Sequence, residues 1–323
     1  MSDSITPGPL PIHIPASDGY RLAGWVWRHA DASPGTPVAV INAATSVRSR
    51  YYSRFAAFLH GHGFHVVTYD YRGIGASHPG RLRGFEASWL SWGELDFEAV
   101  LQFVLQEFPG SPVNVVAHSI GGFVTGLAPS AHRLYRVCTV GSQIAYWRDF
   151  APRQRARMVV QWQIAMPLLT ACLGYFPGKR LGWLEDTPRG VVHDWCHRMR
   201  RYESLVRRGI DPDAIPGRRA LVERCSRLAA PLLAIGIDDD TFGTAAAIER
   251  LLAYFGNSPA THLRLAPEAV GEAAIGHFAF FHNRFEHSLW RIPLQWLQSG
   301  SVPADIPSTL VRSPDSVPAP LPM

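Results

Sequence analysis

The stretch that decides the fold is Val115–Gly122, which reads Val-Val-Ala-His-Ser-Ile-Gly-Gly. It follows an apolar run and precedes small residues that suit a tightly packed helix. A strand, a sharp turn and a helix start are expected, with Ser119 at the tip of the turn. Such a turn strains the serine backbone, so small residues are needed two positions to either side, here Ala117 and Gly121. The pattern predicts an exposed nucleophilic serine, with the N–H of Ile120 facing a bound carbonyl oxygen.

A glycine-rich turn in an ordinary α/β protein would look similar, so the rest of the chain has to decide. The apolar run Pro231–Ile237 predicts a later strand and leads directly into Asp238-Asp239-Asp240. His277 follows Gly276 in a predicted loop, before the last expected helix. A serine, a carboxylate and a histidine therefore occur in the order Ser, acid, His that a serine hydrolase with such a turn requires.

Competing interpretations exist for the acidic and histidine residues. Three adjacent carboxylates resemble a metal site, but no histidine lies near them in the sequence, and no metal is predicted. His282 and His287 lie at or within the last expected helical segment, where a solvated surface histidine is the ordinary interpretation. His277 is therefore favoured as the histidine of the site.

Segments with strand and helix character alternate along the chain, which predicts a mainly parallel sheet with helices on both faces. Residues 1–145 and 217–299 are expected to form this core. Residues 146–216 are aromatic and arginine-rich without a clear strand, and interrupt this pattern between two core strands. Residues 300–323 are rich in Pro, Ser and Val and are expected to be disordered. The expected strands are 12–14, 21–27, 38–41, 64–69, 113–116, 134–140, 231–237 and 262–265.

Taken together, these features resemble the α/β-hydrolase superfamily. The chain is most similar to bacterial predicted α/β hydrolases related to serine-aminopeptidase-like and monoacylglycerol-lipase-like enzymes. The matching stretches are the serine turn, Tyr69–Ser77, Trp92–Asp96, Gly174–Arg180, Asp239-Asp240 and Ile275–Phe281.

The resemblance implies an α/β-hydrolase fold with a catalytic triad, and implies that residues 146–216 form an inserted helical cap. In relatives the acid usually follows the glycine near the strand end, here Gly236, by three residues. This spacing selects Asp239 as the partner of Ser119 and His277, and makes Asp238 and Asp240 turn or helix-cap residues.

The resemblance also places a second oxyanion donor in the loop Asn42–Thr45, where relatives commonly have His-Gly. The backbone N–H of Ala44 is expected to complement that of Ile120, and the Thr45 hydroxyl to add a contact. Small residues at a crowded sheet edge would give the same composition. The acyl or leaving group is expected to lie under the cap, in a pocket formed by Thr45, Gln143, Trp147, Trp162, Met166 and Phe176.

An apolar, aromatic lining favours a hydrophobic ester, thioester or amide, including a carrier- or coenzyme A-linked acyl group. The expected enzyme is a serine hydrolase that works through an acyl-enzyme and needs no cofactor. An acyltransferase on the same scaffold and a non-catalytic ligand-binding protein are the alternatives. The arginines of the cap either meet an anionic substrate or form a solvated helix face.

Composition bears on nucleic-acid binding, cellular location and membrane insertion. The 323 residues are 47% hydrophobic and 18% charged with a formal net charge of +5, which is not by itself typical of a nucleic-acid-binding protein. Four cysteines without paired spacing and an N-terminus unlike a signal peptide favour a reducing, cytoplasmic location. The apolar stretch Met158–Phe176 contains Gln161, Gln163 and Pro167, so two helices lining a pocket are expected rather than a stable membrane insertion.

Overall fold

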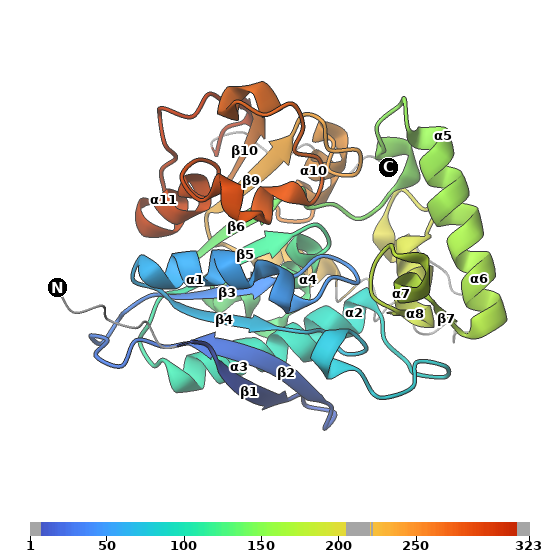
Figure 1. Cartoon of the computed structure of the whole chain (residues 1–323). Coiled ribbons are helices and arrows are strands. Elements are labelled where there is room, and N and C mark those ends of the chain that lie inside the picture. Colours follow the sequence, from blue (N-terminus) through green and yellow to red (C-terminus); the bar gives the residue numbers. More distant parts are fainter. Residues whose placement is uncertain (1–7, 205–219, 221, 315–323) are drawn as a thin grey trace.

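The computed structural model describes residues 8–204, 220 and 222–314. Nine of its strands form one sheet in the order β1-β2-β4-β3-β5-β6-β9-β10-β11 (Figure 1). The strands from β4 to β10 in this order are parallel, whereas β1, β2 and β11 pair antiparallel at the two edges. The strands are β1 Leu10–Pro15, β2 Arg21–Trp27, β3 Val38–Asn42, β4 His65–Tyr69, β5 Val113–His118, β6 Arg136–Val140, β9 Leu232–Ile237, β10 Ala260–Leu265 and β11 Thr309–Arg312.

Helices cover both faces of this sheet, as the alternating sequence predicts (Figure 1). Helices α1 and α11 share one face, where the rings of Phe55 and Trp290 lie 5.2 Å apart. Helices α3, α4 and α10 lie on the other. Strands β3, β4 and β5 are buried along their whole length, which explains their continuous Val- and Ile-rich sequences. The helices of the core are α1 Ser53–Gly61, α2 Trp89–Ser91, α3 Glu98–Glu107, α4 Gly121–Leu127, α10 Ala245–Leu252 and α11 Arg291–Ser299.

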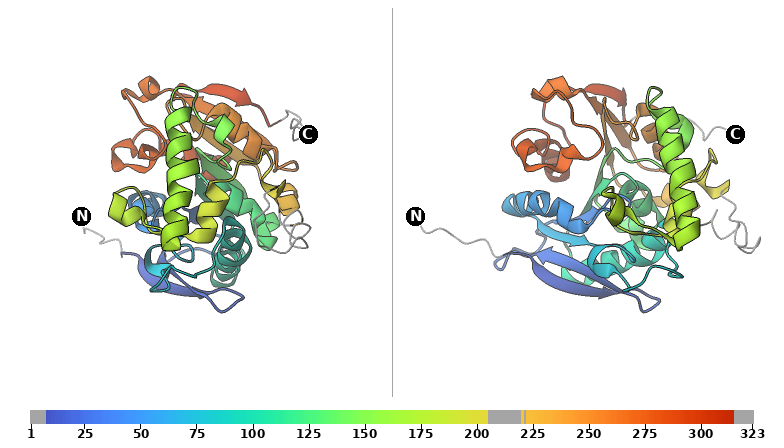
Figure 2. Two further views of the ribbon diagram at one scale, coloured as in Figure 1. Left: turned by 90° about the vertical axis from the view of Figure 1, so that its right-hand side faces the viewer. Right: turned by 45° about the vertical axis from the view of Figure 1, so that its right-hand side comes forward.

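A cap lies between β6 and β9. Its main feature is one continuous helical rod made of α5 Arg155–Met158, a π-helical segment Val159–Ala165 and α6 Met166–Leu173. The apolar stretch predicted to form two helices therefore belongs mostly to one rod, with Pro167 at the point where the π-helical segment passes into α6. Figure 2 shows the rod crossing one side of the molecule. The cap also contains β7 Tyr175–Phe176, α7 Gly178–Leu181, β8 Thr187–Pro188 and α8 Arg189–Trp195.

The predicted boundary between residues 216 and 217 lies outside the described residues. The prediction of a disordered tail is wrong for residues 300–314. Strand β11 pairs with β10, and Arg312 of β11 forms an ion pair with Glu249 at 2.5 Å. Asp305 likewise pairs with Arg291 at 2.7 Å. Four residues are too short a strand signal to find in a Pro- and Ser-rich segment, because the available edge of β10 decides whether they pair.

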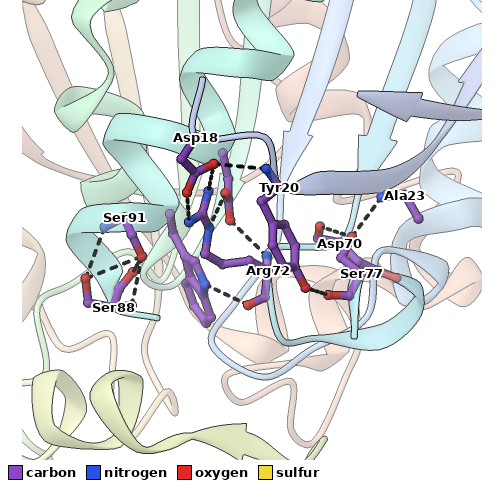
Figure 3. A network of polar contacts seen from close by, with 10 residues as sticks. Asp18, Tyr20, Ala23, Asp70, Arg72, Ser77, Ser88 and Ser91 are labelled. Atoms are coloured by element: carbon purple, nitrogen blue, oxygen red, sulfur yellow. Dashed lines mark hydrogen bonds and ion pairs between the residues drawn. The ribbon is translucent and has the colours of Figure 1, made fainter. Parts of the chain in front are cut away.

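The turn after β4 is held by buried charges (Figure 3). The guanidinium of Arg72 donates to Asp96 at 2.6 Å and to Asp18 at 2.6 Å. Burial raises the pKa of Asp96 to about 7, against the lowering effect of Arg72. The carboxylate of Asp70 accepts N–H bonds from Ser49 at 2.6 Å and Ala76 at 2.8 Å. These bonds fix the Tyr69–Ser77 turn against the segment that follows β3.

Candidate active site

Ser119 stands at the turn between β5 and α4, as the sequence predicts. Its φ of 55° lies in the left-handed region, which a non-glycine residue adopts only under strain. The turn needs glycine at position 121, because a Cβ there would lie 2.5 Å from the carbonyl oxygen of Asn42. Within the described chain, the N–H of Ile120 has no hydrogen-bond acceptor. The sequence therefore produces a serine held at a sheet edge beside an open amide.

His277 lies between Ser119 and a carboxylate. Its Nε2 is 2.9 Å from the Ser119 Oγ, and its Nδ1 is 2.7 Å from the Oδ2 of Asp240. The other Asp240 oxygen accepts N–H bonds from Phe242 and Gly243, both at 2.8 Å. Burial opposes ionisation of Asp240, but His277 and these two N–H groups together lower its pKa below the ordinary value. The arrangement is a serine, a base and an ionised acid in one line of hydrogen bonds.

The prediction that Asp239 contacts the histidine is wrong, since Asp240 occupies that place. The chain turns after β9, where the Asp240 N–H donates to the Ile237 carbonyl. This turn directs the Asp240 side chain over the end of β6, and Gly141 leaves it room, since a Cβ there would lie 2.7 Å from the Asp240 Oδ2. Counting from the strand glycine cannot show which of three adjacent aspartates the turn directs inward.

Asp239 holds the loop that carries the histidine instead. Its carboxylate accepts the N–H of Ile275 at 2.9 Å and that of Gly276 at 2.8 Å. Asp238 points away and pairs with Arg264 at 2.8 Å. The three aspartates thus have three different roles in the fold, and within the described residues no cluster of His, Cys, Asp or Glu could hold a metal ion.

A buried hydrogen-bond chain lies behind the serine. The N–H of Ala44 donates to the Tyr52 hydroxyl at 3.0 Å, and this hydroxyl lies 2.8 Å from the His118 Nδ1. The His118 Nε2 lies 2.8 Å from the carbonyl of His277, which can only accept. His118 therefore carries its proton on Nε2 and accepts from Tyr52. Burial lowers the pKa of His118 to about 3, which keeps its ring neutral.

This chain bears on the predicted oxyanion donor. Ala44 lines the pocket, but its N–H is already bonded to Tyr52, which contradicts the prediction that it is open to a ligand. The next amide, that of Thr45, has no acceptor among the described residues, and Thr45 also lines the pocket. The signal that the sequence analysis missed is Tyr52, whose hydroxyl lies at the end of the short 3₁₀ helix Ser49–Tyr52 that follows the loop.

A cavity of about 220 Å³ opens above the serine, between the core and the cap. Of the predicted lining residues, Thr45, Gln143 and Trp162 line it. Trp147, Met166 and Phe176 do not: Trp147 lies under the Arg148 guanidinium, while Met166 and Phe176 are fully buried in the packing of the cap. The lining residues that the sequence analysis missed are Trp89, Ala145, Gln161, Trp183, Leu184, Trp195, Phe242 and Phe278.

The missed aromatic residues come from segments that fold over the site from distant parts of the chain. Trp89 begins α2 and Trp195 ends α8. The Trp162 ring stacks on Trp195 at 4.8 Å and meets Trp183 edge-on at 5.6 Å. One polar group reaches the serine from the wall, since the Gln143 Nε2 lies 3.4 Å from the Ser119 Oγ. The pocket is an aromatic chamber with polar groups concentrated around the serine.

The arrangement of the sheet matches known structures. The chain superposes on a soluble variant of monoglyceride lipase from Saccharomyces cerevisiae, in complex with a substrate analogue, with a TM-score of 0.64, 15% identity and coverage of 94% of this chain and 98% of that one. The Pyrococcus furiosus esterase Pf2001 gives a TM-score of 0.54 at 15% identity, with 90% of both chains covered. The chain has the α/β-hydrolase fold.

Sequence comparison adds matches over parts of the chain. Residues 39–172 match the family described as serine aminopeptidase, S33. An uncharacterised protein of Mycobacterium tuberculosis (strain ATCC 25618 / H37Rv) is 36% identical over 80 residues, which cover 25% of this chain. The match spans only 28% of that relative's length. Within the described residues, no helix is long and apolar enough to cross a membrane.

Proposed function

We propose that this α/β-hydrolase cleaves a hydrophobic acyl ester, thioester or amide through an acyl-enzyme formed on Ser119. The observation that carries the proposal is the line of hydrogen bonds from Ser119 through His277 to Asp240, at 2.9 and 2.7 Å, which opens into an aromatic chamber. The fold alone hosts many chemistries, so the geometry of these three side chains supports the activity.

The roles of the three residues follow from their atoms. The His277 Nε2 faces the serine and takes its proton as Ser119 attacks the acyl carbonyl. The Asp240 carboxylate accepts a hydrogen bond from the His277 Nδ1–H, which keeps Nε2 free to act as the base and stabilises the imidazolium that forms. His277 then gives its proton to the leaving group. A water molecule activated by the same nitrogen attacks the acyl-enzyme and releases the acid.

Two open amides are available for the charge that develops on the carbonyl oxygen. Ile120 follows the serine at the start of α4, and Thr45 follows the loop that Tyr52 holds. We assign the oxyanion site to the N–H groups of Ile120 and Thr45, in place of Ala44. Loss of one such donor typically costs about 10²–10³-fold in kcat, because the donor stabilises only the transition state.

The volume and the lining of the chamber indicate the size and polarity of the acyl group that fits. Drug-sized ligands occupy pockets of about 300–1,000 Å³, so a cavity of about 220 Å³ fits a small to medium apolar group. Phe242 and the tryptophans offer no charge to pair with a charged substrate. The expected substrate is a neutral acyl group of limited length, with the leaving group directed outward.

Two measurements test the proposal. A fluorophosphonate should label wild-type protein at Ser119, with the site read by mass spectrometry, and should not label Ser119→Ala. A panel of acyl esters of increasing chain length should be hydrolysed by wild type and show a length limit. Phe242→Ala should raise that limit, with each added methylene altering kcat/KM by about tenfold to 200-fold.

Absence of both labelling and hydrolysis in folded wild-type protein would contradict the proposal. Transfer of the acyl group to an added alcohol, amine or thiol, in preference to water, would reassign the protein as an acyltransferase using the same three residues.

A further inference from the structure

The outer face of the cap rod is apolar and exposed. Val160, Ile164 and Leu168 follow one another at helical spacing and are 58%, 44% and 62% exposed. Leu169 and Leu173 are each 36% exposed on the same rod. These five residues are called the cap stripe below. Figure 2 shows the rod on the outside of the molecule, with its length open to the viewer.

The opposite face of the same rod is also apolar. Met158, Trp162 and Met166 are buried against the rest of the cap and the pocket. A helix with apolar residues all round is normally buried on every side. Here one face is covered by the fold, and the cap stripe is not, so it requires a partner outside the described chain.

The charges around the stripe favour one kind of partner. Between Asp149 and Glu185 the sequence contains no acidic residue. Arg153 and Arg157 are exposed before the stripe, and Arg180 is exposed after it, whereas Lys179 is exposed but pairs with Glu185 at 3.0 Å. An apolar helical face with Arg153, Arg157 and Arg180 near its ends suits an anionic lipid surface, where aliphatic side chains enter the acyl region and cations meet headgroups.

We propose that the cap stripe docks reversibly on an anionic membrane surface, with the rod lying in the plane of the interface. At 1.5 Å per residue, residues 160–173 span about 20 Å, enough for a lying helix and too short for a crossing one. A second copy fits less well, because a two-fold contact through this face would bring the same cations together.

Docking would also place the pocket near the lipid. Trp183 is 40% exposed on the cap and also lines the chamber above Ser119. The apolar surface of the cap therefore extends to the wall of the pocket. The docking itself does not depend on catalysis, so it can be tested whether or not the proposed hydrolysis holds.

The test is co-sedimentation of the full chain with vesicles of phosphatidylcholine alone, or of phosphatidylcholine with a minority of phosphatidylglycerol. Wild type should bind the anionic vesicles, and high salt should weaken this binding because it screens the cations. Leu168→Asp should lower the partition coefficient at least about tenfold, since it removes a buried apolar side chain and adds an anion. Arg157→Glu should lower binding to the anionic vesicles only.

Leu10→Asp is the matched control. Leu10 is 56% exposed on β1, away from the cap, and its substitution should leave vesicle binding unchanged. Equal melting temperatures would show that both aspartate variants are folded. The proposal is overturned if wild type does not bind anionic vesicles at low salt, or if Leu10→Asp loses as much binding as Leu168→Asp. It is also overturned if light scattering shows a lipid-free dimer that Leu168→Asp dissociates, since the stripe would then be a contact between copies.

Discussion

Replacement of Asp240 by Asn should inactivate the site while leaving its shape intact. One carboxylate oxygen of Asp240 accepts the N–H groups of Phe242 and Gly243, so an Asn oxygen must take that position. The Asn NH₂ group would then face the His277 Nδ1 and donate to it. This forces the histidine proton onto Nε2, where it points at Ser119 and blocks removal of the serine proton.

The expected size of the effect follows from this wrong tautomer. Such a substitution in a Ser-His-Asp triad lowers kcat about 10⁴-fold, which at about 1.36 kcal/mol per factor of ten is about 5.4 kcal/mol of lost transition-state stabilisation. Asp239→Asn is the matched control. An Asn at position 239 keeps one acceptor for the Ile275 and Gly276 amides, so a loosened histidine loop should cost kcat about tenfold at most.

The assay is hydrolysis of one short acyl ester, with kcat and KM measured separately, together with the rate of fluorophosphonate labelling at Ser119. Asp240→Asn should lose kcat and labelling together and keep its melting temperature within a few degrees. If Asp239→Asn instead loses about a thousandfold while Asp240→Asn stays near wild type, the assignment of the acid from this geometry fails.

Three further outcomes are expected. Tyr52→Phe should lower kcat about 10–100-fold with little change in KM, because it removes the hydroxyl that bonds Ala44 of the proposed oxyanion loop and His118. An unchanged kcat would show that the loop keeps its conformation without this hydroxyl. Ending the chain at Gly300 should lower the melting temperature by roughly 5 °C, through loss of β11 and of Arg312, and leave kcat/KM at low temperature intact; calorimetry checks this. Burial lowers the pKa of His65 from 6.5 to about 4 in the folded protein, so between these pH values the unfolded chain binds a proton that the folded protein does not. The free energy of unfolding, measured with urea, should therefore be constant above about pH 6.5 and decline as the pH falls toward 4. His65→Gln should flatten that decline.

The features that the sequence predicted depend on local rules. Ser119 was predictable because a strained turn admits few residue types around it. His277 follows a glycine in a loop, which also limits the alternatives. The sheet follows from continuous apolar runs, which need burial on both faces whatever their neighbours are.

The features that were missed depend on where a backbone turn directs a side chain. Asp239 and Asp240 are chemically equivalent in the sequence, and only the turn after β9 distinguishes them. Trp89 and Trp195 lie far apart in the chain and meet only when the cap folds over the core. Met166 and Phe176 satisfy the same apolar pattern as true lining residues, and the rotation of the cap rod and its neighbours directs them into packing instead.

In the proposed oxyanion loop, too, the sequence predicts the segment but not the direction of a single N–H group. The resemblance placed a donor in the loop after β3, and both Ala44 and Thr45 of that loop line the pocket. It does not identify the donor, because the direction of an amide depends on what accepts from it. The Tyr52 hydroxyl accepts the Ala44 N–H and donates its own proton to the His118 Nδ1, which accepts because the ring is neutral and carries its proton on Nε2. Because Tyr52 engages the Ala44 N–H, the amides of Thr45 and Ile120 are the ones beside the serine that have no acceptor among the described residues.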